Sequence, residues 1–202
     1  MADLSKEGYL DRSRGRGTFV RERKVVEKIA ILGSFHEAMR RQGIEPAMGV
    51  LDDEITESPL PVSAALGLRG GKVWRLRRLA SIEGRPVALL TAWLPARLAT
   101  ASLRSGHNFA KDSLYDALAD VHQIVMSVAD NLIEVGRANL DEATRLHLAP
   151  GAPVLKVIGI TRDQNDRKVE YSEVLYDTDR FRFSIESRRV ANGATYVADS
   201  SP

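Results

Sequence analysis

A repeated pattern constrains the fold of this chain more than any other feature. The segments ALGLRGGKVWRL (65–76) and RLHLAPGAPVLKV (145–157) both read as the end of a short helix, a glycine stop and the start of a β-rich run. Three residues recur 80 positions later: Leu66 as Leu146, Leu68 as Leu148 and Gly71 as Gly151. Two leucines and a glycine could match by chance. If the match is real, one unit of a helix and a hairpin occurs twice.

Strand signals follow both copies of this pattern. The segment 72–95 has β-rich runs on both sides of Glu83-Gly84, and the segments 154–163 and 168–177 predict a second hairpin. Further strands are expected within 45–60 and at 124–138 and 181–190. Helices are expected in the segments 34–43, 62–71, 113–121 and 140–151, the second ended by Gly67 to Gly71 and the last closed by Pro150-Gly151. The charge-rich segment 21–30 is expected to be a connector. About six antiparallel strands with flanking helices predict an α+β domain, with a groove between its two halves as the natural ligand site.

Composition excludes several classes of function. The chain has 202 residues, enough for one sizeable domain and a small appendage, and no cysteine, which excludes disulfides and thiolate-bound zinc. Its four histidines lack metal-ligand spacing, and no nucleophile elbow or phosphate-binding glycine-rich loop with lysine is present. No apolar run approaches the roughly 20 residues that cross a bilayer, and the N-terminus lacks the apolar core of a signal peptide. We expect a cytoplasmic protein without a membrane partner, metal, cofactor or catalytic activity.

Basic residues are concentrated near the N-terminus. Residues 1–24 contain seven Lys or Arg against four Asp or Glu, although the net charge of the whole chain is only +2. Residues 2–8 read as the last turns of a helix closed by Gly8, and SRGRGTFV (13–20) reads as a tight basic hairpin. The basic character is therefore local, and it precedes the repeated units.

These segments resemble a known family of regulators. KEGYLDRSRGRGTFV resembles the end of the winged-helix DNA-binding domain of GntR-type transcription regulators. SFHEAMRRQGIEP, the 72–95 hairpin, SLYDAL, LHLAPGAPVLKV and KVEYSEVLYDTDRFRF resemble the UTRA effector-binding domain of the HutC subfamily. The resemblance covers about residues 5–190. It implies a chorismate-lyase-like fold, a homodimer, and a small-molecule signal that alters binding to operator DNA.

The resemblance also implies a domain division and a DNA-binding element. Residues 1–24 would be the remnant of the winged helix with a linker, 25–190 the UTRA domain and 191–202 a flexible tail. The wing residues that would contact or approach DNA are Arg12, Arg14, Gly15, Arg16, Gly17 and Thr18. A winged helix needs two further helices before the recognition helix, so we expect operator binding by the intact regulator and weak or no binding by this chain. The alternative for this segment is a solvated basic hairpin.

For the effector site, the resemblance points first to Arg78 and to Ser113 and Tyr115 at a helix start. A helix N-terminus, a serine hydroxyl and an arginine fork together suit an anion such as a phosphate. Ser113 could instead be only an N-cap, and Arg78 could be a surface arginine. Two positions that are often arginine and acidic in sugar-phosphate sensors are Ala80 and Leu90 here. A smaller or more apolar anionic metabolite is therefore expected.

Two further residues match ligand-facing positions of the family, and Ser34 is an additional candidate. Glu170 and Tyr176 stand six residues apart on one predicted strand and so share a face. Glu170 could accept hydrogen bonds from a ligand or be a solvated carboxylate, and Tyr176 could belong to the core with a polar tip. Ser34 could reach the pocket mouth or only cap its helix.

Taken together, these residues predict a ligand-responsive DNA-binding regulator of the repressor type. The alternatives are a stand-alone module for small-molecule binding or dimerisation, and a lyase-like enzyme. The effector, the operator and the regulated genes are not specified by the sequence.

Overall fold

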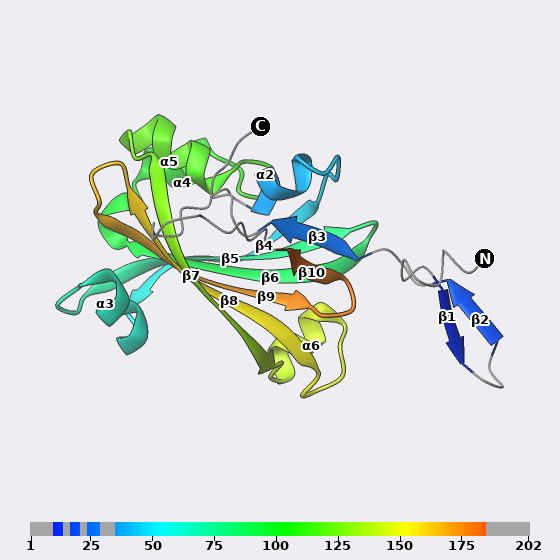
Figure 1. The fold of residues 1–202 in the computed structure, drawn as a ribbon. Helices are drawn as coiled ribbons and strands as arrows, with labels where there is room; N and C mark the ends of the chain where they lie inside the picture. Colours follow the sequence, from blue (N-terminus) through cyan, green and yellow to red (C-terminus); the bar gives the residue numbers. More distant parts are fainter. Residues whose placement is uncertain (1–9, 14–16, 21–23, 29–34, 185–202) are drawn as a thin grey trace, which may run out of the picture.

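The fold is built around one six-stranded antiparallel sheet (Figure 1). The computed structural model describes residues 10–13, 17–20, 24–28 and 35–184. The strands are β4 (Ala47–Glu57), β5 (Lys72–Ile82), β6 (Arg85–Pro95), β7 (Met126–Arg137), β8 (Pro153–Asp163) and β9 (Lys168–Asp177). Their order in the sheet is β4-β5-β6-β9-β8-β7. The predicted α+β class with about six antiparallel strands is confirmed.

The repeat inferred from the sequence is a real structural repeat. The first unit consists of β4, α3 (Leu60–Leu66), β5 and β6, and the second of β7, α6 (Leu140–Leu146), β8 and β9. The two helices start and end 80 residues apart. The two units join where β6 pairs with β9 in the middle of the sheet. From either edge inward, the first, second and third strands of a unit therefore follow one another in the same order. The last strands of both units therefore meet at the centre of the sheet.

The end of α6 corrects the sequence prediction. The helix stops at Leu146, and His147 adopts a left-handed conformation with φ of 55°, as Gly67 does with φ of 68° at the end of α3. Left-handed residues terminate helices because their N–H groups turn back to bond the last carbonyls. The Pro150-Gly151 pair that was expected to close the helix belongs to the following turn.

Helices cover both faces of the sheet (Figure 1). On the upper face lie α2 (Phe35–Arg40), α4 (Ala101–Gly106) and α5 (Leu114–His122), and on the lower face lie α3 and α6. Two apolar clusters fill the upper layer, one around Trp74 and Leu118 and the other around Phe35 and Tyr176. The lower layer also has two clusters, around Val62 and Leu146. The α4 helix was not predicted.

Two further strand pairs flank the main sheet. Residues Leu10–Ser13 (β1) and Gly17–Val20 (β2) form the predicted antiparallel hairpin. Residues Val25–Lys28 (β3), expected to be a connector, instead pair in parallel with β10 (Phe181–Ser184). The last predicted strand therefore joins a separate two-stranded sheet, and its residues 185–190 lie outside the described residues. Local sequence signals missed this pairing because its partners are more than 150 residues apart.

Candidate functional site

A buried polar cluster occupies the middle of the upper face, between the two apolar clusters. Arg78 projects from β5, Thr161 from β8 and Glu170 from β9, and Tyr115 reaches them from α5. The exposed fractions of Arg78, Thr161 and Glu170 are 8%, 1% and 4%. Polar groups are seldom buried so deeply without a purpose or a partner. The solvated alternatives for Arg78 and Glu170 are therefore wrong.

Both hydrogen bonds of the Glu170 side chain go to the same carboxylate oxygen. Tyr115 Oη donates to Glu170 Oε2 over 2.7 Å, and Thr161 Oγ1 donates to the same oxygen over 3.1 Å. The two hydroxyl oxygens are 3.5 Å apart. Within the described residues no hydrogen bond reaches Oε1 of Glu170. That oxygen remains able to accept a bond from a ligand.

Arg78 is a buried cation that has no hydrogen-bond acceptor at Nε among the described residues. Its Nε is buried and has no partner in the part of the chain that the structure describes. The hydrogen bonds of Glu170 come from Tyr115 and Thr161 and not from Arg78. Arg75 and Arg162 also have a buried, unpartnered Nε, but their terminal nitrogens pair with carboxylates. A charged group left in this condition costs free energy that an acceptor would recover.

The electrostatics of the cluster follow from burial. Burial raises the pKa of Glu170, while the hydrogen bonds from Tyr115 and Thr161 and the charge of Arg78 oppose the rise. Burial also raises the pKa of Tyr115 well above its ordinary value, and the nearby Glu170 raises it further. The pKa of Arg78 is lowered by burial, against the attraction of Glu170. Arginine nevertheless remains protonated at physiological pH.

The other predicted effector residues lie apart from this cluster or outside the described chain. Ser113 is the N-cap of α5, where its Oγ accepts from the backbone N–H of Asp116 over 3.3 Å. Tyr176 shares the face of Glu170 but packs among aromatic rings, with its centroid 4.9 Å from that of Phe181. Ser34 lies outside the described residues. Thr161 was missed, although its register opposite Glu170 in the second hairpin is a signal that could have found it.

The predicted DNA-binding residues lie in and around the β1–β2 hairpin. Arg12 in β1 faces Thr18 in β2, and Gly17 begins the second strand. Arg14, Gly15 and Arg16 lie outside the described residues.

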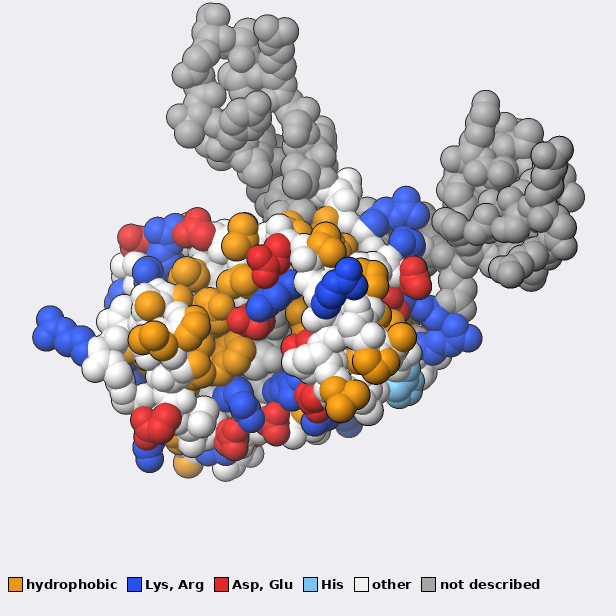
Figure 2. All heavy atoms as spheres, turned by 90° about the horizontal axis from the view of Figure 1, so that it is seen from below, with side chains coloured by type: hydrophobic (Ala, Val, Ile, Leu, Met, Phe, Trp, Pro, Cys, Tyr) orange, Lys and Arg blue, Asp and Glu red, His pale blue; other side chains and the backbone are white. Residues whose placement is uncertain are grey.

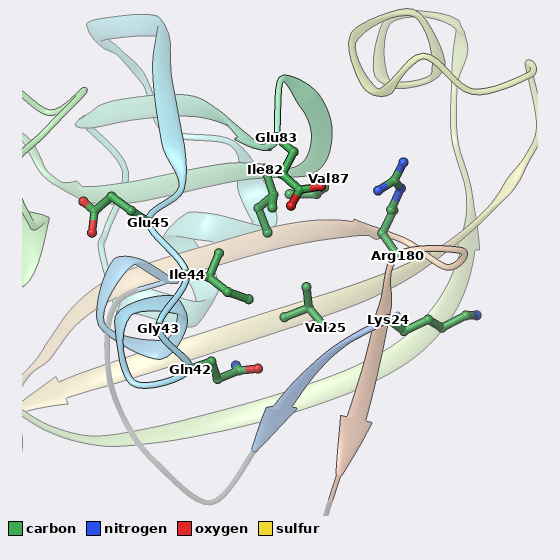
Figure 3. A pocket seen from close by; sticks show the side chains of 10 residues that line it. All are labelled: Lys24, Val25, Gln42, Gly43, Ile44, Glu45, Ile82, Glu83, Val87 and Arg180. Atoms are coloured by element: carbon green, nitrogen blue, oxygen red, sulfur yellow. The ribbon is translucent and has the colours of Figure 1, made fainter. Parts of the chain in front are cut away.

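A hollow of about 760 Å³ lies elsewhere, beside β3 and the β5–β6 turn. Figure 3 shows Val25, Ile44 and Ile82 around its middle, with Lys24 and Arg180 at the side. None of its lining residues belongs to the Arg78 cluster. It combines both charge signs with apolar walls, and no sequence pattern pointed to it.

The described residues contain no helix that is long and apolar enough to cross a membrane. They also contain no group of three or more His, Cys, Asp or Glu that could hold a metal ion.

Comparisons with known proteins identify the family. The UTRA domain family matches residues 41–182. The chain belongs to this family. The repressor NagR of Bacillus subtilis is 30% identical to it over 184 residues, which cover 91% of this chain and 74% of NagR. The chain is therefore a GntR-type, ligand-responsive transcription regulator with a UTRA domain, as the resemblance predicted.

Solved UTRA structures agree with the fold. PhnF from Mycobacterium smegmatis superposes with a TM-score of 0.79 at 26% identity, covering 93% of this chain and 81% of PhnF. The ligand-binding domain of a GntR-family regulator from Bordetella bronchiseptica gives a TM-score of 0.62 at 27% identity, covering 73% of this chain and 92% of that domain.

Proposed function

We propose that this regulator senses a small anionic metabolite that binds between Arg78 and Glu170. The observation that carries the proposal is the buried guanidinium of Arg78, whose Nε has no acceptor among the described residues. An anion would supply charge-assisted hydrogen bonds to the planar fork of the guanidinium. These bonds are stronger in a buried site than in water, since the local dielectric is low.

Glu170 gives the site its second contact. Its Oε2 accepts hydrogen bonds from Tyr115 and Thr161, which fix the orientation of the carboxylate. Its Oε1 can therefore accept a hydrogen bond from a ligand. A ligand that carries both an anionic group and a hydrogen-bond donor would therefore satisfy Arg78 and Glu170 together. The site needs no nucleophile or metal for this role, and we assign it binding without turnover.

A homodimer and operator DNA complete the proposal. We assign DNA contact in the cytoplasm to the wing residues Arg12, Arg14, Gly15, Arg16, Gly17 and Thr18 of segment 1–24, and effector binding and dimerisation to 25–190, followed by a tail at 191–202. Ligand binding can change operator affinity only if the two arrangements of the dimer bind the ligand with different affinities.

The dimer surface proposed is the edge strand β7 with the start of α6. Four of the eight large exposed apolar side chains in the described residues fall in this stretch, namely Val128, Leu132, Val135 and Leu140, and a fifth, Val125, directly precedes β7. Natural sheets seldom leave an apolar edge strand open to water, because it would pair with other chains. Figure 2 shows the lower face, where apolar side chains gather in two places on either side of charged residues. A second copy of this chain would cover β7.

A thermal-shift screen tests the effector site. The wild type, Arg78→Met and the control Arg69→Ala are each melted with a panel of phosphorylated and carboxylated metabolites. A ligand that binds only the folded state stabilises it, by about 2.7 kcal/mol when the ligand concentration is a hundred times its Kd, and so raises Tm. We expect anions that raise the Tm of the wild type and of the control, but not of Arg78→Met. An anion that stabilises all three proteins equally would refute the site.

A further inference from the structure

We infer that the effector carries a hydroxyl group beside its anionic group, and that a polar notch made by Asn131, Gly159 and Ser172 binds this hydroxyl. The inference rests on the proposed function, because it assigns the anionic group to Arg78. It adds a recognition element from the second repeat unit, and it narrows the effector to small hydroxylated anions.

The three residues of the notch form one row across neighbouring strands. Asn131 in β7 pairs with Gly159 in β8, and Gly159 pairs with Ser172 in β9. Ser172 pairs in turn with Ala92 in β6. All four residues lie on the upper face, since Ser172 stands two residues from Glu170 and Gly159 two residues from Thr161. Small residues thus form the floor next to the polar cluster.

Space explains the glycine at position 159. A Cβ atom there would lie 2.7 Å from Ser172 Oγ and 2.9 Å from Asn131 Oδ1, so both side chains lean over the backbone of residue 159. Gly159 does not adopt a positive φ, so its backbone conformation is open to other residues. Neither Asn131 nor Ser172 forms a side-chain hydrogen bond within the described residues. Two polar side chains therefore converge on one point without bonding each other, and Asn131 is exposed, so a ligand can reach its amide from solvent.

The repeat shows why the notch and the cation can act on one ligand. Gly159 occupies in β8 the position that Arg78 occupies in β5. Arg78 pairs with Val50 in β4 and with Leu90 in β6. Gly159 pairs in the same way with Asn131 in β7 and with Ser172 in β9. The first unit thus supplies the long, positively charged side chain of Arg78. The second unit supplies a glycine in the equivalent position, flanked by two short polar side chains.

The two elements are close enough for a small molecule to span them. Leu90, which pairs with Arg78, also pairs with Val174 in β9, and Val174 stands two residues from Ser172 on the same face. Ser172 is about 7 Å along β9 from Glu170, given the rise of a strand. A ligand of a few carbon atoms that is anionic at one end and hydroxylated at the other can reach both.

A serine hydroxyl can donate or accept, and an asparagine amide can do both. An alcohol, which also donates and accepts, matches this pair better than a second anion would. Leu90, which stands opposite Arg78, and Ala92 line the remaining floor with apolar surface.

Matched ligand pairs test the notch by isothermal titration calorimetry on the full chain. The probes are glycerol 3-phosphate against propyl phosphate, and glycerate against propionate, so that each pair differs only in hydroxyl groups. We expect the wild type to bind the hydroxylated member at least about tenfold more tightly, since it satisfies two polar side chains at once. Ser172→Ala and Asn131→Ala should each reduce this ratio at least about threefold. Ser127→Ala, an exposed change on the same strand, should leave it unchanged.

A second variant separates recognition from folding. Gly159→Ala places a methyl group where Ser172 Oγ and Asn131 Oδ1 converge, so these two side-chain ends must move away. Because Gly159 has no positive φ, the backbone can accept alanine, and the variant should still unfold cooperatively but lose the preference for the hydroxylated probe. Equal affinity of the wild type for both members of each pair, with binding still lost in Arg78→Met, would overturn the notch and leave the anion site standing. Binding of no probe would overturn the notch as well. Binding of these probes that is unaffected by Arg78→Met would instead overturn the proposed function.

Discussion

At the scale of single residues, the site depends on two buried charges that are not paired with each other. In the described part of the chain Arg78 lacks an acceptor at Nε, and Glu170 is held by two hydroxyl groups. Such an arrangement contributes little to stability, because the interactions within the site do not fully offset the free energy of desolvating the two charges. It is a suitable ligand site for the same reason, because the ligand supplies the missing partner.

The raised pKa of Glu170 predicts a pH dependence of stability. A carboxyl whose folded pKa lies above its unfolded pKa binds more protons when folded, so its contribution falls as the pH rises above about 4.3. Glu170→Gln removes this loss. Its free energy of unfolding relative to wild type should therefore increase from pH 4 to pH 7. Urea denaturation over this range measures the difference.

Glu57→Gln is the control for this experiment, because Glu57 is an exposed carboxylate at the end of β4. It shows what the removal of one exposed carboxylate does over the same pH range. A Glu170→Gln difference that follows that of Glu57→Gln, or that falls with pH, would mean that burial does not govern this carboxyl.

At the scale of elements, local signals predicted what local interactions determine. The hairpin turn at Glu83-Gly84 and the stop at Gly67 have positive φ values that their residues favour or tolerate, and both were found from the sequence. The early end of α6 was missed because histidine is an uncommon left-handed residue. The β3–β10 pair and the contact of Tyr115 with Glu170 depend on distant segments, which local patterns cannot show. The family resemblance, and not periodicity, brought Arg78, Tyr115 and Glu170 to notice.

The left-handed caps of the two repeat helices give a reciprocal prediction. His147→Gly should stabilise the protein by about 1 kcal/mol, because glycine adopts φ of 55° without the steric cost that histidine carries. Gly67→His should destabilise it by a similar amount. His107→Gly, at a helix end with φ of −129°, should bring no gain. Urea denaturation checks all three, and a loss of stability in His147→Gly would show that the His147 side chain makes a stabilising contact.

At the scale of the whole molecule, duplication places one strand of each half at the centre of the sheet and leaves one at each edge. The central pair, β6 and β9, lies under the proposed effector site, and the outer strand β7 carries the proposed dimer surface. The β8 strand, which contributes Thr161 and Gly159, lies between them. Ligand binding and dimer geometry could therefore be coupled through adjacent strands.

The dimer surface is tested by a pair of equivalent substitutions. Leu140→Glu places a charge on the proposed interface, and Leu60→Glu makes the same change at the corresponding residue of the first unit. These leucines are 71% and 82% exposed, so neither change should affect folding. We expect Leu140→Glu to shift the protein toward monomer in analytical ultracentrifugation, and Leu60→Glu to remain dimeric. A dimer unaffected by Leu140→Glu would place the interface elsewhere.

The most direct test of the anion site is to observe the Arg78 Nε–H group itself by ¹⁵N NMR. The signal is assigned by its loss in Arg78→Met, and it is then followed while an anion that stabilises the wild type is titrated. If the anion binds Arg78, this signal should shift progressively to saturation, at the same concentration that saturates the increase in Tm. An Arg78 signal that stays in place while the protein becomes saturated would contradict the account, because the anion would then be bound somewhere else.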